Sequence, residues 1–176
     1  MLERILRLGQ LYFAIAIWRR GPQDLPAIGI LLPLTIAAYV LVSVVVGVIL
    51  PSMRPGWVWQ VLLDTAFMAL WYWLLLQSAR RPERYLQTAS ALFGLQIIIA
   101  APTMILVWLM ERLPPDDTLR VPVFLVSLAL AIWTLAAIGH ILRAALERSL
   151  VFCLMLALLQ MLVEELMFAS IFGAGP

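Results

Sequence analysis

Three carboxylates lie inside long apolar runs of the chain: Asp64, Glu164 and Glu165. An ionisable residue inside a membrane-spanning segment is costly, so such residues often mark a proton, ion or ligand site. Asp64 follows the start of its run by seven residues, and Glu164 precedes the end of its run by eight. At about 1.5 Å per residue, both lie roughly 10–12 Å deep. The alternative interpretations are hydrogen bonding between helices and contact with a partner subunit.

Hydroxyl side chains from three further runs fall at a similar expected depth. They are Ser43, Thr103 and Ser127. Buried polar groups need hydrogen-bond partners, and in a membrane these come from neighbouring helices. The sequence therefore predicts a polar layer near one face of the membrane, with Asp64 protonated or hydrogen-bonded to these hydroxyls.

The adjacent glutamates Glu164 and Glu165 also resemble the paired glutamates of membrane CAAX-type proteases. That family's pattern continues Glu-Glu-x-x-x-Arg, whereas this chain has Ala169 at the last position and lacks the family's additional histidines. The single histidine, His140, and the single cysteine, Cys153, cannot form a metal-binding set. Because no phosphate loop or Ser/His/Asp set occurs either, we expect no enzymatic activity and no metal or other cofactor.

The elements that carry these residues are apolar helices. The chain is 64% hydrophobic and 12% charged, whereas soluble domains are about half apolar and about a quarter charged. Each run has roughly the 20 residues that a hydrocarbon core of about 30 Å requires. We predict an all-α polytopic membrane helix bundle, occupying residues 27–173, in which short connections make sequential helices antiparallel. Its five transmembrane helices are expected at about 27–50, 57–78, 87–110, 121–139 and 149–172.

An amphipathic helix is expected before these spans, within residues 1–20. Polar residues share one side of it, and apolar residues populate the rest, which is typical of a segment that lies in the membrane interface. Basic residues here and in the loop after the second span could contact phospholipid headgroups or a partner. These residues are Arg4, Arg7, Arg19, Arg20, Arg80, Arg81 and Arg84.

The distribution of arginines predicts the orientation. With the N-terminus inside, nine arginines fall on the inside and only Arg54, Arg112 and Arg120 on the outside, as the positive-inside rule favours. We therefore expect a multi-pass protein of a bacterial inner membrane, with a cytoplasmic N-terminus and a periplasmic C-terminus. The net charge of +2 gives no indication of nucleic-acid binding.

The second half of the chain, about residues 57–173, resembles the Yip family (Ypt-interacting-protein type) of five-span membrane proteins. The resemblance rests on the segments 61–66 (VLLDTA), 85–91 (YLQTASA) and 137–150 (AIGHILRAALERSL), together with Trp133. It implies a non-enzymatic role in membrane organisation or trafficking. Eukaryotic members carry an Asp-Leu-Tyr-Gly-Pro motif that this chain lacks, so small-GTPase binding is not implied.

Two functions remain open from the sequence. The first is a non-enzymatic membrane protein that organises a complex or a local membrane region through helix and lipid contacts. Its expected partners are phospholipid and another membrane protein or a second copy of the chain. The second is a small transporter or proton- or ion-conducting protein that uses Asp64 with Glu164 or Glu165.

Overall fold

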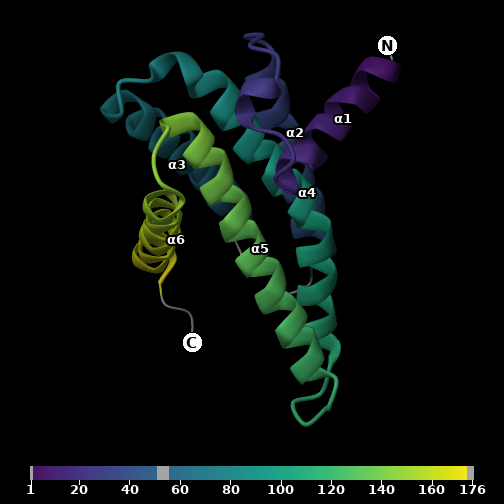
Figure 1. Cartoon of the computed structure of the whole chain (residues 1–176). Coiled ribbons are helices and arrows are strands. Elements are labelled where there is room, and N and C mark those ends of the chain that lie inside the picture. The colour runs from purple at the N-terminus through teal and green to yellow at the C-terminus, as the bar shows by residue number, and fades with distance from the viewer. Residues whose placement is uncertain (1, 51–55, 174–176) are drawn as a thin grey trace.

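The computed structural model describes residues 2–50 and 56–173, and these residues form helices joined by short connections (Figure 1). Five of the helices are long and apolar enough to cross a membrane, so the predicted all-α membrane fold is confirmed. The helices are α1 (Leu2–Ala16), α2 (Leu31–Ile49), α3 (Trp57–Ser78), α4 (Tyr85–Arg112), α5 (Arg120–Leu146) and α6 (Leu150–Phe172). Two short 3-10 turns, η1 (Pro22–Asp24) and η2 (Pro82–Arg84), precede α2 and α4.

Helix boundaries differ from the predicted spans mainly in α5. The fourth span was expected to end at residue 139, but the helix continues through His140 and Arg143 to Leu146. It ends where Glu147 adopts a left-handed conformation, with φ of 54°. Polar residues near the end of the apolar run suggested a loop, yet they form the last turns of the same helix. α4 continues unbroken through Pro102, and Figure 1 shows it curving along its length.

Helix α4 is the centre of the bundle. It packs against α2 and α5 most extensively and also contacts α1 and α3, while α6 packs on α5 and touches α3. Sequential helices do pack together, as expected, but the broad α2–α4 contact joins helices that are not consecutive. The order of helices along the chain therefore does not by itself give their order in space.

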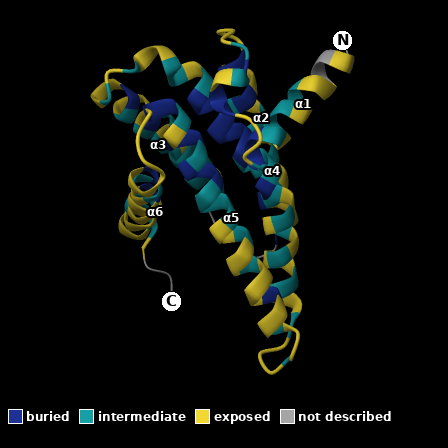
Figure 2. Ribbon diagram, in the orientation of Figure 1, coloured by how far each residue is buried: buried dark blue, intermediate teal, exposed yellow. Residues whose placement is uncertain are grey.

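The hydrophobic core occupies one half of the bundle. It contains the ends of α3 and α5 and the first half of α4, with large buried side chains such as Tyr72, Phe93 and Leu142. The link 17–30 and the connections 79–84 and 147–149 meet at this end, which we call the closed end. Figure 2 shows buried residues gathered there, whereas the α4–α5 hairpin is mostly exposed toward its tip. We call the opposite end, with the connection 113–119, the open end.

The C-terminal half of α1 is docked in the bundle. Ile15 and Ala16 are fully buried, and the Tyr12 hydroxyl lies 2.9 Å from Oγ1 of Thr35 in α2. The N-terminal half of α1 extends away from the other helices (Figure 1). A segment expected to lie wholly in the membrane interface is therefore also a packing element of the closed end.

Candidate functional site

The intramembrane carboxyl groups meet where α2, α3 and α6 converge in the open half. The Tyr39 hydroxyl donates a hydrogen bond to Oδ2 of Asp64, and Asp64 also hydrogen-bonds to Glu164. Ser43, one turn after Tyr39, shares a hydrogen bond with the tyrosine hydroxyl. The structure thus brings together Asp64, Glu164 and Ser43, whose similar depths were inferred from the sequence.

Tyr39 was missed by the sequence reasoning, although it connects the serine to the carboxyl groups. Its aromatic ring counted as apolar, and its hydroxyl was overlooked. The signal was available, because residues four apart share one face of a helix. Tyr39 and Ser43 have that spacing and begin and end a single turn of α2.

The other predicted members of the polar layer lie apart from this contact chain. Ser127 donates to the carbonyl oxygen of Val123 in its own helix, at 2.9 Å. Thr103 and Ser127 both line a cavity of about 240 Å³ between α4, α5 and α6. Glu165 is exposed on the surface of α6. The layer is therefore one connected cluster with separate hydroxyls around it, and it is not a continuous ring.

Two larger cavities border the carboxyl cluster. One, of about 480 Å³, lies between α2, α3 and α4 and is lined by Tyr39, Ser43 and Thr103 among others. The second, of about 360 Å³, is lined by Gln60, Asp64 and Phe168 as well as Tyr39. Polar groups in the open half thus face unfilled space, unlike the buried pair Tyr72 and Gln160, whose side chains hydrogen-bond at 2.6 Å.

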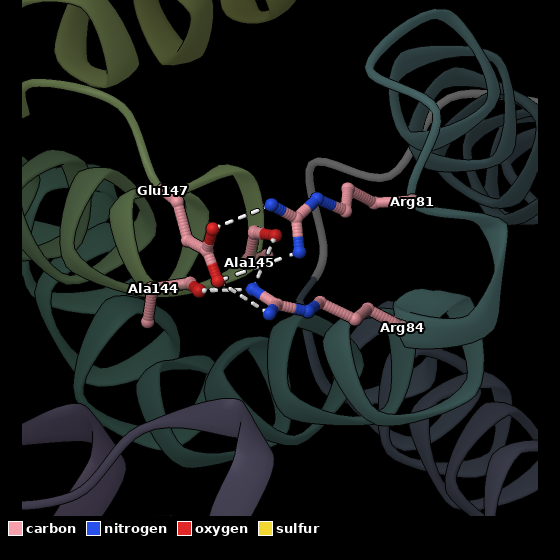
Figure 3. Close-up of polar contacts among 5 residues, drawn as sticks. All are labelled: Arg81, Arg84, Ala144, Ala145 and Glu147. Carbon is pink, nitrogen blue, oxygen red and sulfur yellow. Dashed lines mark hydrogen bonds and ion pairs between the residues drawn. The ribbon is translucent and has the colours of Figure 1, made fainter.

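A second polar cluster ties the closed end together (Figure 3). Arg81 and Arg84 each approach a different carboxylate oxygen of Glu147, at 2.5 Å. Arg84 also donates to the carbonyl oxygens of Ala144 and Ala145, both at 3.1 Å. These carbonyls belong to the last turn of α5, where a cation is favourable because the helix leaves its final carbonyl groups unpaired.

The electrostatics of this cluster act on Glu147. The hydrogen bond from Arg84, followed by the charges of Arg81 and Arg84, lowers the pKa of Glu147 below its ordinary value of 4.5. Glu147 follows the last residue of α5, and its side chain is 51% exposed. Solvent therefore screens the ion pairs and keeps their stabilisation small. They hold the connection before α4 against the end of α5.

Further side chains reinforce the closed end. Nε2 of Gln87 donates to the Leu25 carbonyl oxygen at 2.6 Å, and Nε2 of His140 donates to the Arg20 carbonyl oxygen at 3.1 Å. The Arg20 guanidinium lies 3.5 Å from Asp24. These contacts fix the link between α1 and α2 against α4 and α5.

The arginines predicted to contact lipid therefore divide into two groups. Arg20, Arg81 and Arg84 have carboxylate partners within the chain, as described above. Arg7, Arg19 and Arg80 are exposed. The side chain of Arg4 and the whole of Arg54, which was counted toward the orientation, lie outside the described residues.

Comparison with protein-family models, with curated proteins and with solved structures finds no match. The similarity to the Yip family accordingly stays a prediction from the sequence. Within the described residues, no three His, Cys, Asp or Glu side chains are grouped so as to hold a metal ion.

Proposed function

We propose that this multi-pass membrane protein is a non-enzymatic organiser of a membrane complex, and that its open half receives a transmembrane helix of a partner protein. The observation that carries the proposal is the position of the carboxyl side chains. Asp64, which hydrogen-bonds to Glu164, lines an open cavity, and Glu165 projects from the surface of a membrane-spanning helix.

Each of these groups is costly against lipid. Two carboxylates in contact repel each other when both are charged, and lipid tails offer no hydrogen-bond donor. A partner helix with amide, hydroxyl or basic side chains would supply donors and fill the cavities. Interhelical polar contacts of this kind stabilise membrane complexes, and the resemblance to the Yip family would also imply a non-enzymatic role.

The test is site-specific photocrosslinking in the native membrane. A photoreactive residue replaces Ala169, which is exposed one turn after Glu165 and on the same face of α6. The matched control replaces Leu128, an exposed residue of α5. We expect a protein adduct from position 169 but not from position 128, and Glu165→Ala should reduce its yield.

Both the mass and the position of the adduct decide the outcome. A discrete adduct at position 169 supports a partner helix, and a mass of two chains identifies that partner as a second copy. Lipid adducts alone at position 169, or equal protein adducts from positions 169 and 128, would contradict the proposal.

A small transporter or proton-conducting protein is the second candidate, and the contact chain of Tyr39, Asp64 and Glu164 beside open cavities favours it. Against it, Tyr72 and Leu142 are fully buried in a packed apolar core between the cluster and the closed end. Conduction requires a route through that core. Proton flux into liposomes that contain the protein, abolished by Asp64→Asn, would favour this candidate, whereas absence of flux at any gradient would eliminate it.

A further inference from the structure

A separate cavity at the closed end has the features of a ligand site. Its volume is about 310 Å³, within the range of small-molecule sites. The link before α2, the start of α4 and the end of α5 enclose it. The lining side chains used below are Gln23, Arg84, Thr88 and Glu147. None of these residues belongs to the carboxyl cluster of the open half, so the inference does not depend on the proposed partner helix.

Thr88 is the residue that points to a ligand. It is 1% exposed, it lines the cavity, and its Oγ1 has no hydrogen-bond partner among the described residues. Three of the other helical threonines satisfy their hydroxyls by donating to the carbonyl oxygen four residues earlier. These are Thr35, Thr65 and Thr134, at 2.7 to 2.8 Å. Buried polar groups are normally hydrogen-bonded, so a buried hydroxyl without this bond indicates a hydrogen-bond partner outside the chain.

The charge around the cavity favours an anion. Arg84 lines the cavity and pairs with the carboxylate of Glu147, and Arg81 pairs with the same carboxylate. Two guanidinium groups therefore face a single carboxylate. Arg84, Gln87 and Thr88 also lie at the start of α4, a helix of 28 residues. The N-terminal end of a helix dipole attracts negative charge, and phosphate groups bind readily there.

The depth of the cavity indicates where the anion comes from. Helix α5 ends at Leu146 and α4 begins at Tyr85, so the cavity lies at the ends of two candidate spans, where membrane-crossing helices leave the hydrocarbon region. Phospholipid phosphates occupy this level of a bilayer, and basic pockets between transmembrane helices bind anionic headgroups.

We propose that this cavity binds the phosphate group of an anionic phospholipid, with Thr88 Oγ1 donating a hydrogen bond to it and Arg84 and Arg81 supplying positive charge. Glu147 competes with the phosphate for the two guanidinium groups. The resulting site would hold one lipid between the link, α4 and α5, at the end where the chain is most tightly packed.

The experiment uses the purified full chain in a nonionic detergent. Dihexanoylphosphatidylglycerol, dihexanoylphosphatidylcholine and inorganic phosphate are titrated separately, and binding is measured by calorimetry. We expect saturable binding of phosphatidylglycerol at one site per chain, and weaker binding of both other probes. A hydrogen bond to a charged group is worth enough that Thr88→Val should weaken the binding of phosphatidylglycerol about tenfold.

Matched variants separate the site from general effects. Thr88→Ser keeps the hydroxyl and should bind as wild type does. Ser90→Ala removes another buried hydroxyl without a partner, one that does not line the cavity, and should leave binding unchanged. Glu147→Gln removes the competing carboxylate and should tighten binding, which keeps the proposal testable if Thr88→Val fails to fold.

Three results would overturn the proposal. If wild type and a folded Thr88→Val bind phosphatidylglycerol equally well, the Thr88 hydroxyl does not contact the ligand. Equal binding of phosphatidylcholine and phosphatidylglycerol would remove the preference for an anionic headgroup. If inorganic phosphate binds as tightly as phosphatidylglycerol, the site takes free phosphate and the lipid assignment is wrong.

Discussion

The docking of α1 depends on a glycine in α4, and this contact gives a sharp test of the packing at the closed end. A Cβ atom placed on Gly94 would lie 2.2 Å from Cδ1 and 2.3 Å from Cε1 of Tyr12. No real Cβ contact is this short, so Gly94→Ala forces the tyrosine ring to move. The ring cannot move far without breaking the hydrogen bond between its hydroxyl and Thr35.

Three effects set the size of the change. Overpacking typically costs about 1–3 kcal/mol, and loss of the hydrogen bond adds about 0.5–1.5 kcal/mol. Alanine is favoured over glycine in a helix by about 1 kcal/mol. We therefore expect Gly94→Ala to lower the free energy of unfolding by roughly 0.5–3.5 kcal/mol. In a Tyr12→Ala background the ring is absent, so Gly94→Ala should be neutral or stabilising.

The assay is a double-mutant cycle on unfolding in mixed micelles, combined with the rate of trypsin cleavage at Arg19 and Arg20. Release of α1 should expose these arginines of the link and speed cleavage in Gly94→Ala. Gly9→Ala is the control, because a Cβ there meets nothing within 4 Å. If Gly94→Ala lowers the free energy of unfolding by the same amount with and without the Tyr12 ring, the contact does not hold α1 and the reasoning fails.

Two further predictions concern the buried pair of α3 and α6 and the ion pairs of the closed end. Tyr72→Phe leaves the buried amide oxygen of Gln160 without its donor, so it should lower the free energy of unfolding by about 1–3 kcal/mol; wild-type stability would contradict this. Because Arg84 and Arg81 lower the pKa of Glu147, the stabilisation from this carboxylate should be present above pH 4.5 and lost as the pH falls through the lowered pKa. Thermal melts of wild type and Glu147→Gln should therefore differ near neutral pH and converge in acid, and a constant difference would refute the linkage.

The five spans were predictable because one property, the length of an apolar run, decides whether a helix can cross a membrane. The contacts between helices were not. Apolar side chains lie on every side of α2 and α4, so no single hydrophobic face identifies the neighbouring helix. The broad α2–α4 contact instead depends on how the side-chain shapes of the two helices fit together, which the sequence alone does not give.

In the candidate sites too, features set by local sequence were predictable, whereas contacts between residues far apart in the chain were not. Counting residues along each apolar run gives Asp64 and Glu164 a similar expected depth, and the structure brings their side chains into contact. The partner of Arg84 lies 63 residues away in Glu147, and nothing in the local sequence distinguishes this arginine from its exposed neighbour Arg80. Arg84 is thus paired with a carboxylate across the bundle, a contact that arginine counting cannot foresee.

Residue size explains why one half of the bundle is packed and the other open. The buried positions near the closed end include many small residues, such as Ala89 and Ala91 of α4 and Ala137 and Ala145 of α5. Small side chains let helices approach closely, which is the main source of packing energy in a membrane. The part of α5 in the open half instead carries large exposed side chains, including Phe124. The partner helix that we propose would therefore contact the open half, away from the closely packed helices of the closed end.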